Sequence, residues 1–157
     1  MRSELLTFGT IRLHAMKTLY LDVEHEYNFD LYGMVSPCKE YKLAWALNRL
    51  LDIHLIKKQD IYYDLTGKNQ LVIANYLYSS EFSTVRLFRN RALGFNTLKK
   101  PFLLPDMKEY DYILQVTGAL QQLYPQELIK KLQRISLIQY VKQFDPLTLK
   151  FKENLLL

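Results

Sequence analysis

Apolar and polar residues alternate along four stretches of the chain, and this alternation predicts β-strands. In the first stretch, 18–36, Leu19, Leu21 and Val23 alternate with acidic and aromatic residues, which is typical of a strand with one buried face. The other stretches are residues 54–65, 70–78 and 83–93. Because Thr66-Gly67-Lys68-Asn69 is a good hairpin turn between two of them, we expect three neighbouring strands in an antiparallel meander.

Helical spacing of apolar residues follows in two places. Residues 36–52 carry a buried stripe, with Ser36 as the expected N-cap and Pro37 at the first helical position. The same spacing recurs over 125–136, and further strands are expected over 110–116 and 137–144. This order of elements predicts an α+β domain of two layers, in which two helices cover one face of a mainly antiparallel sheet.

The length of 157 residues and an apolar fraction of 49% fit one domain with a real core. We place that domain at 16–157 and expect residues 1–15 to be a weakly ordered extension, because Met16-Lys17 resembles an alternative start. The one cysteine, Cys38, excludes an intramolecular disulfide and suits a reducing cytosol. No apolar run approaches the ~20 residues that span a bilayer. These features predict a cytoplasmic protein that does not insert into a membrane.

The net charge of +5 is modest, but the charges are unevenly distributed along the chain. Four acidic residues fall in a stretch without Lys or Arg: Asp22, Glu24, Glu26 and Asp30. Five basic residues fall in a stretch without Asp or Glu: Arg86, Arg89, Arg91, Lys99 and Lys100. If these side chains are exposed, the surface has poles of opposite sign, which either keep the protein soluble or attract a partner.

The basic stretch is interleaved with Phe88, Phe95 and Phe102. Phosphate-pairing cations with aromatic rings are the mixture that single-stranded nucleic-acid binders use. The expected contacts on that interpretation are Arg86, Arg89, Arg91, Lys99, Lys100 and Phe95. The stretch contains no RNP-type or KH-type motif, and a hairpin whose phenylalanines point into the core explains the same residues.

Three carboxylates lie close together in residues 104–112, Leu-Pro-Asp-Met-Lys-Glu-Tyr-Asp-Tyr. Such a cluster could bind a divalent cation or exchange protons, through Asp106, Glu109 and Asp111. The alternative is architectural: Pro105 opens a helical turn that Asp106 caps, Asp111 braces a loop, and Tyr112 packs inward.

Other kinds of site are not indicated by the sequence. The histidines His14, His25 and His54 lack metal-ligand spacing, and Cys38 has no partner cysteine. The five glycines are isolated, so that no phosphate-binding loop is predicted. We therefore expect no cofactor and no metal ligand set, and no nucleophile with an adjacent base.

The 104–112 stretch resembles the signature of the bacterial IPExxxVDY family. Pro105, Asp111 and Tyr112 match that signature, whereas Leu104, Asp106 and Tyr110 replace its Ile, Glu and Val. The resemblance extends over most of the chain outside residues 1–15, and it implies a fold and a compartment but no activity.

Taken together, the patterns favour a non-catalytic protein-interaction or regulatory domain. Its expected partner is an unknown protein or a second copy of the chain. The alternatives left open are RNA binding through residues 86–100 and a carboxylate-dependent metal site or enzyme at 106–111.

Overall fold

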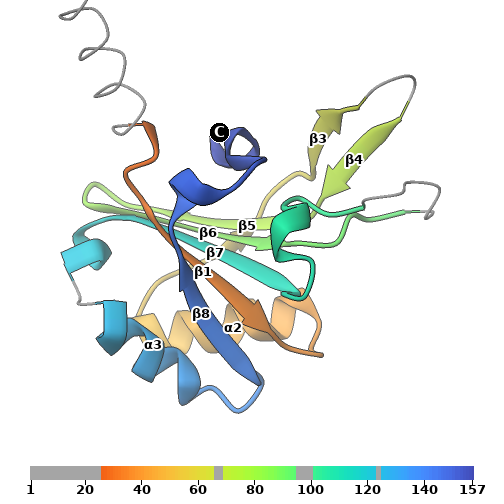
Figure 1. Ribbon diagram of the computed structural model, residues 1–157. Helices are drawn as coiled ribbons and strands as arrows, with labels where there is room; N and C mark the ends of the chain where they lie inside the picture. Colours follow the sequence, from red (N-terminus) through yellow and green to blue (C-terminus); the bar gives the residue numbers. More distant parts are fainter. Residues whose placement is uncertain (1–25, 66–68, 95–100, 123–124) are drawn as a thin grey trace, which may run out of the picture.

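The structure is a computed structural model that describes residues 26–65, 69–94, 101–122 and 125–157. Its centre is a six-stranded sheet with the strand order β2-β5-β6-β7-β1-β8, in which every neighbouring pair is antiparallel (Figure 1). The strands are β1 (Asp30–Val35), β2 (Ile56–Lys57), β5 (Asn75–Ser79), β6 (Ser83–Arg89), β7 (Tyr112–Gly118) and β8 (Tyr140–Phe144).

Both helices cover the same face of this sheet (Figure 1), so that the predicted α+β class and helix placement are confirmed. Helix α2 (Glu40–Leu51) buries Leu43, Ala44 and Leu47, and α3 (Pro125–Gln133) buries Leu128 and Leu132. The predicted apolar stripes supply these residues. On the sheet side, they pack in one core with Tyr32, Met34, Val85, Leu87, Tyr112, Leu114, Val116 and Val141.

The opposite face of the sheet is also covered, by a hairpin and short helical turns (Figure 1). The hairpin pairs β3 (Ile61–Asp64) with β4 (Gln70–Ile73), and the turns are η1 (Pro105–Met107), η3 (Pro146–Thr148) and η4 (Lys152–Leu155). A fourth turn, η2 (Ala119–Gln122), follows β7. This cover explains why Leu31, Phe88 and Ile113, which point away from the helices, are fully buried. Because η4 buries Leu155 there, the chain's last turn completes the second core.

Several predicted boundaries were wrong. Helix α2 begins at Glu40 rather than near Ser36, because the Ser36 hydroxyl donates to the Leu137 carbonyl oxygen and does not cap the helix. The predicted runs 54–65 and 70–78 each divide into two strands, and the two halves enter different sheets. The alternation of apolar and polar residues does not reveal where one strand ends and the next begins, because both halves of each run keep the alternating pattern. The predicted extension 1–15 and the first strand's residues 18–25 lie outside the described residues.

Two tyrosines on neighbouring strands of the helix-covered core differ in their hydrogen bonds. The Tyr112 hydroxyl donates to the Cys38 carbonyl oxygen at 2.5 Å. The Tyr32 hydroxyl is buried and has no hydrogen-bond partner among the described residues. Burial, with a contribution from the Asp30 carboxylate, raises the pKa of Tyr32 to about 12. The pKa of Tyr112 is also raised, again mainly by burial.

This difference predicts opposite effects of removing the two hydroxyl groups. Tyr32→Phe should leave the free energy of unfolding at pH 7 unchanged or higher, whereas Tyr112→Phe should lower it by about 1 kcal/mol through the lost hydrogen bond. Urea unfolding monitored by circular dichroism measures both. Equal destabilisation by the two substitutions would contradict the conclusion that the two hydroxyl groups differ in their hydrogen bonds.

The raised pKa of Tyr32 also predicts a dependence on alkaline pH. The folded state keeps this phenol protonated above its ordinary pKa of 10.0, while the unfolded chain ionises it. The contribution of Tyr32 to stability is therefore complete below pH 10 and is lost as the pH rises towards about 12. Over that window, Tyr32→Phe should lose less stability than the wild type, as measured by urea unfolding at several alkaline pH values.

Candidate functional site

Residues 104–112, the 104–112 loop, are held in place by Asn90, which directly follows β6. Asn90 is fully buried. Its side-chain amide donates to the carbonyl oxygens of Met107 (2.8 Å) and Tyr110 (3.0 Å), and its side-chain oxygen accepts from the Leu104 N–H (3.0 Å). The Asn90 main chain adds a bond at each end of the loop, to Leu103 (2.7 Å) and Asp111 (2.9 Å). Asn90 therefore contacts the loop at both ends and in the middle.

The predicted motif residues of this loop bind distant parts of the chain. Pro105 opens the turn η1, as expected. Asp106 does not cap that turn; its carboxylate accepts from the Lys150 N–H (2.8 Å) and so binds the C-terminal tail. Asp111 accepts from the Ser36 N–H (2.9 Å), which fixes the chain just after β1. Tyr112 packs inward as predicted.

The three carboxylates of the loop do not form a common site. Asp106 and Asp111 are directed at different segments through the bonds just described, and Glu109 is exposed. Within the described part of the chain, no group of three or more His, Cys, Asp or Glu side chains could hold a metal ion. The arrangement thus favours the architectural interpretation of these carboxylates over a metal site.

The predicted basic surface is divided by the sheet. Arg86 lies on the face away from the helices, half-buried, with its guanidinium 3.4 Å from the Asn75 side-chain oxygen and 5.9 Å from the Phe88 ring. Burial lowers the pKa of Arg86. Arg89 lies on the helix side, where its guanidinium is 3.8 Å from the Glu40 carboxylate. Lys99, Lys100 and Phe95, the other predicted nucleic-acid contacts, lie outside the described residues.

Two of the predicted arginines meet the 104–112 loop at a cavity of about 330 Å³, which we call the basic pocket. Its cationic side chains are Arg89, Arg91 and Lys108. The remaining wall consists of Ser36, Pro37, Cys38, Phe102, Tyr110, Asp111 and Tyr112. The pocket therefore combines part of the predicted basic cluster with part of the predicted motif.

The charge in the basic pocket is unbalanced. Among the described residues, Asp111 is the one acid in its wall, and that carboxylate accepts the Ser36 N–H. Neither Arg91 nor Lys108 forms an ion pair with an acid in the described ranges, and the Arg89–Glu40 pair is long. Because guanidinium groups bind carboxylates and phosphates through paired hydrogen bonds, an anionic group fits this pocket best.

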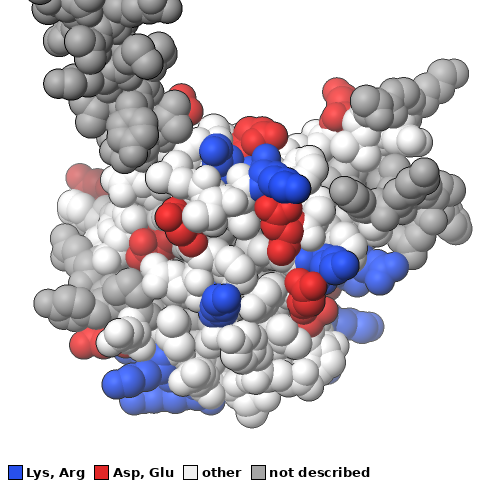
Figure 2. Space-filling view, viewed as in Figure 1, with Lys and Arg blue, Asp and Glu red and all other residues white. Residues whose placement is uncertain are grey.

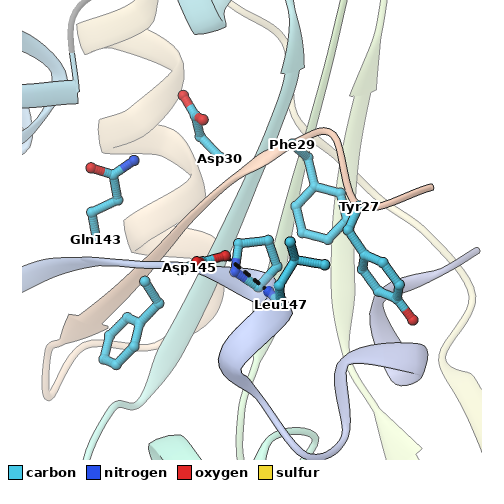
Figure 3. Close-up of a pocket in the computed structure, with 8 residues that line it drawn as sticks. Tyr27, Phe29, Asp30, Gln143, Asp145 and Leu147 are labelled. Carbon is cyan, nitrogen blue, oxygen red and sulfur yellow. Dashed lines mark hydrogen bonds between the residues drawn. The ribbon is translucent and has the colours of Figure 1, made fainter. Parts of the chain in front are cut away.

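A second cavity, of about 420 Å³, lies where β1 begins and β8 ends (Figure 3). Its wall includes Tyr27, Phe29, Asp30, Gln143 and Asp145. Figure 3 shows the polar ends of Asp30 and Gln143 lying away from the two aromatic rings. The Asp145 carboxylate accepts the Leu147 N–H at 3.0 Å and so caps η3. These polar groups do not converge on one point, which makes this cavity a weaker site than the basic pocket.

No family model matches the chain, and neither a curated protein nor a solved structure shows significant similarity to it. The resemblance of the 104–112 loop to the IPExxxVDY signature therefore stays a prediction. In the part of the chain that the structure describes, no helix has the length and apolar character needed to cross a membrane.

Two residues that matter at this site were not singled out from the sequence. Lys108 is inside the motif, but its side chain was not counted with the basic residues. Asn90 stands between Arg89 and Arg91, a setting that favours an exposed position, so that no local signal indicated its burial. The strand period of two does separate Arg86 from Arg89 and could have shown that they face opposite ways.

The hydrogen bonds of Asn90 predict a large effect of its removal. Asn90→Ala should lower the free energy of unfolding by about 3 kcal/mol, because it leaves buried main-chain groups of the loop without partners. Asn48→Ala is the matched control: this half-buried side chain also clamps main chain, at Leu55, and its loss should cost about 1 kcal/mol. Urea unfolding compares the two, and equal losses would contradict the role given to Asn90.

The Asp111–Ser36 hydrogen bond predicts a smaller loss of stability, which a substitution that keeps an acceptor should largely restore. Asp111→Ala should lower the free energy of unfolding by about 1 kcal/mol, whereas Asp111→Asn keeps an acceptor and should recover most of it. Thermal unfolding of both variants, with and without Mg²⁺ or Ca²⁺, measures this. Stabilisation by either ion in the wild type but not in Asp111→Ala would instead indicate a metal site.

Proposed function

We propose that the protein is a non-catalytic binding domain whose basic pocket receives an anionic group presented by a protein partner. The observation that carries this proposal is the set of three cations, Arg89, Arg91 and Lys108, around one cavity in which Asp111 is the one acid among the described residues. An excess of positive charge in a recess attracts anions and orients them better than the same charge on a flat surface.

An acidic protein segment fits the surroundings of the pocket better than a nucleic acid does. Single-stranded nucleic acids need a row of exposed rings next to the cations that bind phosphate. Phe88 is fully buried in the second core, and Arg86 lies on the other face of the sheet. The described residues therefore offer one anion site with half-buried Phe102 and Tyr110 beside it, rather than an extended track.

The groups in the pocket wall support binding rather than catalysis. The Cys38 thiol is 2.9 Å from the Ser36 hydroxyl, which donates its own proton to the Leu137 carbonyl oxygen. In the described part of the chain, no histidine lines the wall, so that no imidazole base from those residues lies beside the thiol or the hydroxyl.

The proposal predicts saturable, salt-sensitive binding of acidic peptides. Titration of the ¹⁵N-labelled protein with a hexaglutamate peptide and with inorganic phosphate should shift the amide resonances of Ser36, Cys38, Arg91 and Lys108. Arg91→Ala and Lys108→Ala should each weaken binding by about tenfold, the loss of one charge-assisted hydrogen bond. Lys130→Ala on α3 removes the same charge away from the pocket and should leave the affinity unchanged.

Three outcomes would contradict the proposal. Equal weakening by Lys130→Ala would mean that the peptide senses only net charge. Absence of saturable shifts around the pocket would mean that it is not a site. Tighter binding of a poly(U) oligonucleotide than of the peptide, with a steep loss of affinity as salt increases, would favour the nucleic-acid interpretation.

A further inference from the structure

A second surface, on the outer side of α2, has features that the basic pocket does not explain. Trp45 is 61% exposed and Tyr41 is 56% exposed, although large aromatic side chains are usually covered. The two residues are four positions apart on α2, so that they lie side by side on the helix surface. With Lys42 and Leu137 they line a shallow depression of about 430 Å³, the apolar depression.

The residue types at the apolar depression are those that dominate protein–protein binding energies. The Arg49 guanidinium lies 4.8 Å from the Trp45 ring centre, which extends the row Tyr41–Trp45–Arg49 along one side of α2. Trp, Tyr and Arg are the residues most enriched among interface hot spots. A helix laid along such a row can insert apolar side chains at helical spacing into the depression.

The charges around the apolar depression indicate which charge a partner should carry. Lys42 is in the wall of the depression, Arg49 stands over the Trp45 ring, and Lys39 is exposed at the N-terminal end of α2. The acidic residues of this helix and its ends are Glu40 and Asp52. Figure 2 shows Lys and Arg gathered at the end of the molecule that carries α3. Glu40 is also turned towards Arg89, 3.8 Å away. A partner with acidic side chains beside its apolar anchors is therefore complementary.

We propose that the apolar depression, with the basic residues around it, is the docking surface for an acidic amphipathic helix of a protein partner. A second copy fits less well, because a two-fold contact would bring Lys42 and Arg49 of both copies together. A stacked base fits less well, since Arg49 already covers the Trp45 ring. The inference rests on α2 and not on the basic pocket, so that either can fail without the other.

Trp45 is the single tryptophan of the chain, and its fluorescence reports directly on this surface. The probe is a synthetic amphipathic peptide of four to five helical turns, with Leu at i, i+3, i+4 and i+7 and Glu elsewhere. Its counterpart has Lys in place of every Glu. The acidic peptide should shift the Trp45 emission to the blue in a saturable way and bind at least tenfold more tightly than the basic one.

The surface is then tested with two variants and two controls. Tyr41→Ala and Lys42→Glu should each weaken the acidic peptide about tenfold. Lys150→Glu makes the same charge change on the far side of the sheet, next to Leu149 of the second core, and should leave the affinity unchanged. Arg91→Ala, which empties the basic pocket of one cation, should also leave it unchanged. Far-ultraviolet circular dichroism confirms that each variant is folded.

Several results would overturn the inference. The acidic peptide could leave the Trp45 emission unchanged, or bind no better than the basic peptide. A blue shift with phosphatidylglycerol-containing vesicles, and none with the peptide, would identify a membrane surface instead. A shift with poly(U) alone would identify a nucleic acid, and a shift that grows with protein concentration alone would identify self-association.

Discussion

The buried side chain of Asn90 is the interaction on which the candidate site depends. A primary amide in a core is tolerated when its donors and acceptor are paired, and Asn90 meets this condition by bonding to Leu104, Met107 and Tyr110. These bonds hold the 104–112 loop against the end of β6, which in turn places Asp111 next to Ser36. The hydrogen bonds of Asn90 therefore help to position the wall of the basic pocket.

The packing of β1 against the 104–112 loop also determines the position of this loop. Gly33 lies within β1, and a Cβ atom there would be 2.7 Å from the Tyr110 ring and 2.8 Å from the Met107 methyl group. Only a residue without a side chain lets the loop approach the strand this closely. The Tyr110 ring also packs edge-on against Phe144 of β8, at 5.0 Å. The loop thus fits a surface made by two strands as well as the hydrogen bonds of Asn90.

The sequence predicted those features that local patterns control. Helical stripes gave α2 and α3, and the order of elements gave the antiparallel α+β class. It could not show that 70–78 divides near Ala74, because that break depends on the Ala74 carbonyl accepting the Arg89 N–H and on the second core below β4. Nor could it show that Asn90 is buried, since the bonds that permit its burial come from residues 14–20 positions away.

The motif residues and the cationic residues have different roles at the site. Pro105, Asp106, Asp111 and Tyr112 bind or pack against the protein itself, at η1, the C-terminal tail, Ser36 and Cys38. Arg89, Arg91 and Lys108 present their charges in the wall of the basic pocket, which Asp111 and Tyr112 also line. Cations that line one cavity repel one another, and the long Arg89–Glu40 pair offsets this repulsion only in part, so the cluster lowers the stability of the fold. The hydrogen bonds of Asn90 and Tyr112 stabilise the surrounding structure and offset this loss of stability. A rigid motif and a cluster of positive charges can therefore lie next to each other.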